Sequence, residues 1–331
     1  MAGAFVTTPD IARIEAARAR IEGHARRTPF LTSPFLDEIA GRRVFVKAEC
    51  LQKTGSFKYR GARAALSALS AEEAARGVVA ISSGNHAQGV ALAAQELGIK
   101  AAILMPADAP RMKLDNTRAL GAEVIEYDRF GEDRAALGTG IAEERGAVLI
   151  PPFDHLEVIA GQGTTGLEIA EQVADAGIEA ADVLVCTGGG GLSSGIALAL
   201  EAKAPGLRVR PVEPEGFDDV ARSLAQGNHV ANAPGAHSIA DAILTETPGM
   251  LTFPILHRLA GPGLAVADDD ALRAMAEAFR RLKLVLEPGG AVALAGALFQ
   301  PEAVTGDAVI AVATGGNVDA DIFARALSYA E

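Results

Sequence analysis

The chain has 331 residues, of which 49% are hydrophobic, so it is long enough for two domains that share a cleft. A formal net charge of −12 and the lack of a basic tract exclude nucleic acid as a partner. No apolar run is long enough to cross a bilayer, and residues 1–10 lack the pattern of a signal peptide, so we expect a cytoplasmic protein outside the membrane. Cys50 and Cys186 stand singly in apolar runs, which is typical of buried thiols in a reducing compartment.

From residue 77 onward, short β-branched runs alternate with Ala- and Leu-rich segments of helical period. The predicted strands of the first series are 78–81, 101–105, 123–127 and 148–150, and the predicted helices between them are 85–97, 111–120 and 134–145. The second series consists of strands 183–186, 207–212 and 308–312, with a helix at 194–203. This alternation predicts an α/β fold with two parallel-sheet units, joined by crossings at 47–57 and 151–152.

Four consecutive glycines, Gly188 to Gly191, stand between the strand 183–186 and a helix expected to begin near Ser193. Backbone N–H groups of such a loop can point inward together, and the helix N-terminus adds positive potential. The segment therefore predicts a cradle for a phosphate group. A tight turn between strand and helix is the simpler alternative, but a turn alone needs fewer glycines.

A dinucleotide-binding site is another alternative for the same loop, because Glu213 ends the next strand about 20 residues later, where such sites carry an acid. However, the Gly-x-Gly-x-x-Gly spacing fails, since Ser193 or Ser194 occupies the position of the last glycine. An NAD-dependent dehydrogenase is therefore only a remote alternative.

Three further motifs lie where a predicted strand ends or a helix begins. Lys58 lies in Lys-Thr-Gly-Ser-Phe-Lys-Tyr-Arg-Gly-Ala, residues 53–62, where a lone lysine would ordinarily be solvated. Residues 82–89, Ser-Ser-Gly-Asn-His-Ala-Gln-Gly, suit a carboxylate at a helix N-terminus, or simply cap the helix. Residues 313–319, Ala-Thr-Gly-Gly-Asn-Val-Asp, follow the last strand. Because open parallel sheets bind ligands beyond the carboxyl ends of their strands, we expect these motifs to converge.

Taken together and in this order, the four motifs resemble those of the fold-type II pyridoxal-phosphate enzymes, in particular the serine/threonine dehydratase and serine racemase group. The resemblance covers nearly the whole chain. Residues 127–134 and 150–155 look closest to the 3-hydroxyaspartate ammonia-lyases. The resemblance to this family implies the tryptophan synthase beta-like fold. The cofactor would lie in a cleft between a large domain (1–50 and 152–331) and a small mobile domain (51–151). The resemblance also implies a homodimer.

The resemblance assigns roles to individual residues. Lys58 would carry pyridoxal 5'-phosphate as a Schiff base, Phe57 would line the pocket and Asn85 would hydrogen-bond the phenolic oxygen of the cofactor. Thr314 would lie beside the pyridine nitrogen, where the group usually has Ser. The phosphate would be held by the backbone of Gly188, Gly189, Gly190, Gly191 and Leu192. The substrate carboxylate would be received by Ser83, Asn85 and His86.

A segment rich in carboxylates, residues 213–219, has oxygen ligands at a spacing that suits a hard cation. In the resembling group, the matching segment supplies two carboxylates and a backbone carbonyl, here Glu213, the carbonyl of Phe217, and Asp219. The cation would be Mg²⁺, or Ca²⁺ or Mn²⁺. The alternative is an acidic, solvated loop that opens a helix.

The predicted reaction is α,β-elimination from a small β-hydroxy amino acid, which yields a 2-oxo acid and ammonia. Serine, threonine and 3-hydroxyaspartate are all open as substrates, and Arg134 would bind the second carboxylate of the last. A hydroxyl at Thr314, instead of an acid, favours elimination over transamination. A serine or aspartate-type racemase is the alternative, with Ser83 as the second acid/base. One departure is Ala242, where relatives have Gly, and its methyl group is expected to narrow the pocket.

Overall fold

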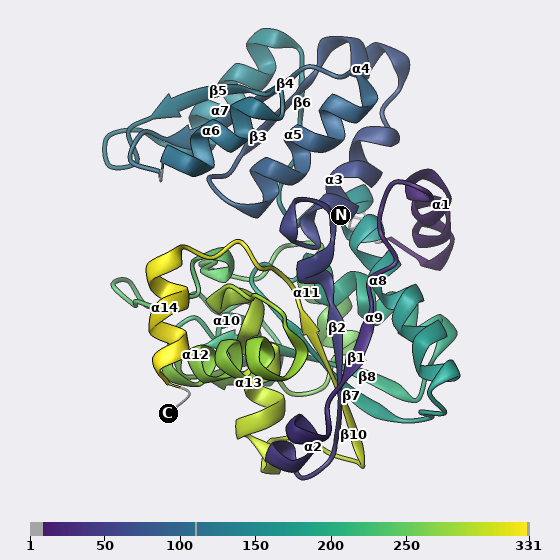
Figure 1. Cartoon of the computed structure of the whole chain (residues 1–331). Helices are drawn as coiled ribbons and strands as arrows, with labels where there is room; N and C mark the ends of the chain where they lie inside the picture. Colours follow the sequence, from purple (N-terminus) through teal and green to yellow (C-terminus); the bar gives the residue numbers. More distant parts are fainter. Residues whose placement is uncertain (1–8, 110, 330–331) are drawn as a thin grey trace.

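The computed structural model describes residues 9–109 and 111–329, and two sheets organise this part of the chain (Figure 1). Residues 1–8, on which much of the signal-peptide expectation rests, lie outside the described residues. Within the described ranges, no helix is both long and apolar enough to cross a membrane. The two expected α/β units are present, one in each half of the molecule in Figure 1.

The smaller unit is built on a four-stranded parallel sheet of order β5-β4-β3-β6. Its strands are β3 (Val78–Ile81), β4 (Ala101–Pro106), β5 (Glu123–Tyr127) and β6 (Val148–Leu149). Its helices are α4 (Ala71–Arg76), α5 (Asn85–Leu97), α6 (Arg111–Ala119) and α7 (Arg134–Arg145). Apolar side chains of α5 and α6 cover one face of the sheet and those of α7 the other, as the predicted alternation requires.

The larger unit has a six-stranded sheet of order β1-β2-β10-β7-β8-β9, in which only β1 is antiparallel to its neighbour. Its strands are β1 (Phe30–Thr32), β2 (Arg43–Ala48), β7 (Ala181–Cys186), β8 (Leu207–Pro214), β9 (Leu264–Val266) and β10 (Ala308–Ala313). The remaining α-helices are α1 (Ile11–Ile21), α2 (Pro34–Ala40), α3 (Lys58–Ser67), α8 (Leu156–Asp175), α9 (Gly191–Lys203), α10 (Asp219–Gln226), α11 (Thr252–Leu259), α12 (Asp268–Glu277), α13 (Pro288–Phe299) and α14 (Ala320–Ser328).

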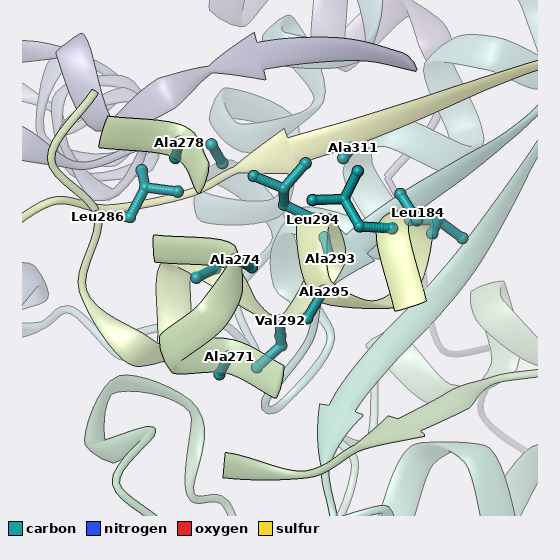
Figure 2. Close-up of a cluster of buried hydrophobic side chains, with 14 of the residues drawn as sticks. Leu184, Ala271, Ala274, Ala278, Leu286, Val292, Ala293, Leu294, Ala295 and Ala311 are labelled. Atoms are coloured by element: carbon teal, nitrogen blue, oxygen red, sulfur yellow. The ribbon is translucent and has the colours of Figure 1, made fainter. Parts of the chain in front are cut away.

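Both faces of the six-stranded sheet are buried, which explains why its central strands are continuous apolar runs. Along β7, Val183 and Val185 pack against α8 and α9, whereas Leu184 and Cys186 belong to the cluster formed with α12 and α13. Figure 2 shows Ala293 and Leu294 of α13 near Leu184 and Ala311 of the sheet, with Ala271 and Ala274 of α12 farther from the sheet, on the side of Val292. The many alanines thus allow α13 to lie close to the sheet and α12 to pack closely on α13.

A buried group of charges fixes α3, the helix that begins with Lys58. Arg60 of α3 bonds Glu49 through Nε at 2.8 Å and Glu168 of α8 through Nη1 at 2.8 Å. Lys47 of β2 bonds the other oxygen of Glu168 at 2.5 Å. Burial alone would raise the pKa of Glu168, but the charges of Arg60 and Lys47 outweigh it and hold that pKa below its usual value. The network ties α3 to β2 and α8 of the larger unit.

Candidate active site

A cavity of about 390 Å³ lies where the carboxyl ends of the strands of both sheets converge. It is of the size in which proteins bind small ligands. The structure brings most of the predicted site residues together in its wall. The predicted residues that line it are Phe57, Lys58, Ser83, Asn85, His86, Arg134, Gly188, Gly189, Gly190, Gly191 and Leu192. The expected convergence of the motifs is therefore confirmed.

Lys58 is the first residue of α3, and its side chain reaches into the cavity. Its Nζ donates a hydrogen bond to the carbonyl of Pro152, at 2.9 Å, in the segment that connects the two units. Burial lowers the pKa of Lys58 to about 8, and the nearby Glu287 carboxylate opposes that shift only in part. An amine with such a pKa is available as a nucleophile and as a base near neutral pH.

The glycine loop is held beneath Phe153, another residue of the connecting segment. A Cβ at Gly189 would overlap the Phe153 ring, and one at Gly191 would press against the Phe153 backbone and Cβ. Gly190 has a φ of 89°, which favours glycine. Within the described chain, the N–H groups of residues 188–190 donate no hydrogen bond, and α9 begins directly at Gly191. The loop therefore offers free donors and a helix N-terminus to an anion, which fits a phosphate group.

The helix α9 begins two residues earlier than the sequence predicts, at Gly191 instead of near Ser193. Two glycines at the end of the loop suggested an extended turn, because glycine has a low helix propensity. In the structure Gly191 belongs to the first turn of the helix, and Gly190 takes the left-handed conformation before it. The last glycine thus brings the helix N-terminus directly to the cavity.

Ser83, Asn85 and His86 lie around the N-terminus of α5, and Asn85 is its first residue. Among the described residues, the Ser83 hydroxyl has no hydrogen-bond partner, although the neighbouring Ser82 accepts a bond from the N–H of Gly84. The His86 ring bonds the Ile150 carbonyl through Nε2 at 2.8 Å. Burial, together with the charge of Lys58, lowers the pKa of His86 to about 3, so its ring is neutral. The one N–H of the neutral ring is therefore used by the Ile150 carbonyl, which leaves the backbone N–H of His86 as its donor for a carboxylate.

Arg134 is the first residue of α7 and lies in the cavity wall, as the sequence predicted for a residue that faces the substrate. No ion pair of Arg134 occurs within the described part of the chain. A second cation of the wall, Lys113 of α6, was not identified from the sequence. Its Nζ lies 3.6 Å from Asp241 of the larger unit, so the two units are joined by an ion pair at the cavity.

Of the two remaining predicted residues, Ala242 lines the cavity and Thr314 does not. Thr314 is buried directly after β10, and it is not one of the described residues that line the cavity. Its backbone carbonyl accepts a hydrogen bond from Phe57, so it is linked to the segment that carries Lys58. Ala242 lies in the wall, and its Cβ faces Gly289, where an added Cβ would be only 3.2 Å away. The narrowing of the pocket by the methyl group of Ala242 stays a prediction.

Two further polar residues of the cavity wall, Glu287 and Asn317, were not assigned a role from the sequence. Glu287 precedes α13 and accepts a hydrogen bond from Asn85 Nδ2 at 2.6 Å. Burial raises the pKa of Glu287 to about 7, although the bond from Asn85 counteracts it. Asn317 donates to Asn85 Oδ1 at 2.7 Å. Asn317 stands within a motif, whereas Glu287 has only the adjacent Pro-Gly-Gly as a signal.

The proposed cation ligands lie outside the cavity, around the N-terminus of α10. Glu213 and Asp219 are both buried, so the alternative of a solvated acidic loop is wrong for them. Glu213 accepts hydrogen bonds from the N–H groups of Val220 and Ala221. Burial and the charge of Asp219 raise the pKa of Glu213 well above its usual value.

Asp219 has one oxygen bonded to Asn232 and another, Oδ2, that is buried without a hydrogen-bond partner in the described chain. Two buried carboxylates and an unsatisfied oxygen fit a bound cation. The described residues contain no cluster of three or more His, Cys, Asp or Glu side chains arranged for a metal, so a cation here would need the Phe217 carbonyl and water. Because Glu213 is fully buried, it cannot serve as the exposed acid of a dinucleotide site.

Comparison with known proteins agrees with this geometry. Residues 21–315 match the family model described as pyridoxal-phosphate dependent enzyme. The chain is 42% identical, over 94% of each sequence, to an L-threo-3-hydroxyaspartate ammonia-lyase of Saccharomyces cerevisiae. It is also similar to the structure of maize serine racemase, with a TM-score of 0.89, 38% identity and coverage of 97% of this chain and 98% of that one. The structure of a T.th. threonine deaminase gives a TM-score of 0.89 at 43% identity, covering 94% of this chain and 99% of that one.

Proposed function

The chain belongs to the family of pyridoxal-phosphate-dependent enzymes and has the fold-type II architecture. On this basis we propose that it is an ammonia-lyase that converts a small β-hydroxy amino acid to a 2-oxo acid and ammonia, through α,β-elimination of water. The observation that carries this proposal is Lys58, an amine with a pKa of about 8 in a cavity that also holds a glycine cradle and free helix N-termini. The relatives include enzymes named for 3-hydroxyaspartate and for threonine. Serine, threonine and 3-hydroxyaspartate are the proposed substrates.

The residues that would hold the cofactor are Lys58 on its aldehyde carbon, the N–H groups of Gly188 to Leu192 on its phosphate, and Asn85 on its phenolic oxygen. When bound, the cofactor supplies an electron sink for the α-carbon of the substrate. Phe57 would lie beside it, and Thr314 would offer a hydroxyl to its ring nitrogen without holding that nitrogen protonated. The fit of these residues to the cofactor rests on the free N–H donors of the glycine loop.

Lys58 is proposed as the base that takes the α-proton. Its lowered pKa leaves an appreciable share of neutral amine near pH 7, and the Pro152 carbonyl can accept a hydrogen bond from the resulting ammonium. The N-terminus of α5 would bind the substrate carboxylate through backbone N–H groups beside Ser83 and Asn85. The β-hydroxyl would leave as water and take up one proton, which balances the α-proton that Lys58 removes, and hydrolysis of the released enamine would give the 2-oxo acid and ammonia.

The small domain, residues 51–151, would close over the substrate and exclude water, while its helix α3 stays tied to the larger unit through Arg60. Support comes from the Lys113–Asp241 ion pair, which joins a residue of each unit beside the cavity. A cation at Glu213, the Phe217 carbonyl and Asp219 would act on the fold of the larger unit, because these residues lie outside the cavity wall. Mg²⁺, Ca²⁺ or Mn²⁺ is the proposed ion.

A serine or aspartate-type racemase is the second candidate function. It is favoured by the Ser83 hydroxyl, which lies in the cavity wall without a hydrogen-bond partner among the described residues. Lys58 can reach only one face of the α-carbon, so inversion needs a second acid/base on the other face. Relatives named serine racemase are 40% identical to the chain over 95% of its length.

The test of the proposal is Lys58→Ala. The variant should lose ammonia release from all three substrates and the near-visible absorbance of the bound cofactor, because no other amine of the site stands in its position. Lys53→Ala is the matched control, since Lys53 lies in the same motif but pairs with Glu96 outside the cavity. A Lys58→Ala variant with wild-type turnover would refute the central assignment.

A further inference from the structure

Asn85 is clamped between two residues that come from separate parts of the chain. We propose that Asn317 and Glu287 are positioning residues that hold the Asn85 amide in one orientation, so that it meets the cofactor as a hydrogen-bond donor. The inference rests on the proposed pyridoxal-phosphate function and adds two residues to its site. Asn85 belongs to α5 of the smaller unit, whereas Glu287 and Asn317 belong to the larger unit.

The polarity of this chain of hydrogen bonds is set at its Asn317 end. Asn317 Nδ2 donates to the backbone carbonyl of Thr54 at 2.8 Å, and a carbonyl can only accept. The same nitrogen donates to Asn85 at 2.7 Å, so the oxygen of the Asn85 amide must face it. The nitrogen of Asn85 then faces Glu287, whose carboxylate accepts at 2.6 Å. A reversed Asn85 amide would set its nitrogen against Asn317 Nδ2 and its oxygen against Glu287, so only one orientation satisfies every partner.

The backbone leaves room for this clamp at two glycines. A Cβ at Gly55 would come within 2.5 Å of Asn317 Oδ1, and a Cβ at Gly315 would overlap the Glu287 carboxylate. Thr54, which supplies the first carbonyl, has a φ of 60°, a conformation that is strained for a β-branched residue. The glycines and the strained Thr54 indicate that the backbone around Asn85 is restricted to the conformation that these hydrogen bonds require.

The consequence for the site concerns the second N–H of Asn85. One N–H is taken by Glu287, and the other remains on a nitrogen whose position is fixed. A fixed donor stabilises the deprotonated form of a phenolic oxygen, because no reorganisation is needed when the charge forms. Glu287 and Asn317 thus act on the cofactor through Asn85.

The experiment measures cofactor binding and the spectrum of the bound cofactor, apart from turnover. Apoprotein is titrated with pyridoxal 5'-phosphate, and the ratio of the long-wavelength to the short-wavelength band reports deprotonation of the phenolic oxygen. Asn317→Asp replaces the donating amide with oxygen, so we expect Kd to rise about tenfold and the band ratio to fall. Asn228→Asp, on an exposed loop, is the control and should leave both unchanged.

Two comparisons separate positioning from a general structural role. Asn317→Ala should add nothing to Asn85→Ala in the double variant, because Asn317 acts through Asn85. Glu287→Gln keeps an acceptor and should retain a band ratio near that of the wild type, whereas Glu287→Leu should lose it. Additive losses in the double variant, or equal behaviour of the two Glu287 variants, would overturn the proposal. A wild-type protein that develops no cofactor band would instead refute the proposed function.

Discussion

Ser83 is the residue on which the choice between lyase and racemase depends. Its hydroxyl lies in the cavity wall and has no hydrogen-bond partner within the described chain. If it is the second acid/base, Ser83→Ala should keep elimination from L-configured substrates, since Lys58 still takes the proton. Turnover of D-serine and racemisation should fall at least about 100-fold. The measurement is ammonia release and chiral analysis with both enantiomers of serine.

Ser82→Ala is the control for that variant, because the Ser82 hydroxyl is already engaged with the N–H of Gly84. Equal losses of Ser83→Ala on both enantiomers would assign Ser83 to carboxylate binding. A wild-type protein inactive on D-serine would make it a plain lyase.

Arg134 is proposed to bind the second carboxylate of 3-hydroxyaspartate. Arg134 lines the cavity, and a guanidinium can form paired hydrogen bonds to a carboxylate. Arg134→Ala should lower kcat/KM for 3-hydroxyaspartate by about 100-fold and change that for serine or threonine by less than about threefold. Arg129→Ala, which removes an exposed arginine paired with Asp108, is the control. The same loss on every substrate would contradict a role in specificity.

Single residues were predictable where they belonged to a local motif. Lys58, Asn85 and the glycine loop each belong to a motif of a few consecutive residues, which can be found in the sequence alone. The structure places all of them in the wall of the cavity. Glu287 could not be predicted, because its place in the site depends on Asn85, 202 positions away in the sequence. Lys113 was missed for a related reason, since only the packing of α6 beside the larger unit brings it near Asp241.

At the scale of elements, the helix α10 and the strand β8 present two buried carboxylates to one another. Glu213 caps the N-terminus of α10 through two backbone N–H groups, and Asp219 keeps one oxygen without a partner in the described chain. A cation would relieve the repulsion between them. Removal of divalent cations with a chelator should therefore lower Tm by about 5 °C or more, and added Mg²⁺ or Ca²⁺ should restore it.

Asp219→Asn should abolish that response to the cation, whereas Glu215→Gln, at an exposed acid of the same segment, should preserve it. A wild-type Tm that is the same with chelator and with metal would contradict the cation site. The sequence pattern identified these carboxylates, but it could not predict that they are buried, because their burial depends on how α10 packs against β8.

At the scale of the whole molecule, the buried charges around Glu168 connect α3, α8 and β2. Glu168→Gln leaves Lys47 and Arg60 without their shared carboxylate and should lower the free energy of unfolding by roughly 3–5 kcal/mol at pH 7. Glu171→Gln, one turn further along α8 at an exposed ion pair, should change it by less than about 1 kcal/mol. Urea unfolding measures both.

The difference between Glu168→Gln and the wild type should also depend on pH. The folded protein holds the pKa of Glu168 below its usual value, so the carboxylate contributes stability above that value and loses its contribution as the pH falls through the lowered pKa. The two proteins should therefore converge in stability at acid pH. A difference that stays constant down to pH ~3 would show that packing, and not charge, is what the substitution disturbs.

The overall architecture followed from periodicity, since nearly every predicted strand of the two series is present to within two residues. Periodicity did not predict the strands β1, β2 and β9, nor the antiparallel pairing of β1 with β2. These strands are short or lie at or next to an edge of the sheet, so they lack the long alternation with helices that identifies a parallel sheet.

The lysine at the start of α3 has one more consequence, which concerns the protein before it acquires its cofactor. With a pKa of about 8, roughly a tenth of Lys58 side chains are unprotonated at pH 7, compared with fewer than one in a thousand for an ordinary lysine. A cavity of about 390 Å³ also has room for other small carbonyl compounds. We therefore expect the empty protein to be modified at Lys58 by sugars and reactive aldehydes, and we expect early loading with the cofactor to protect this amine.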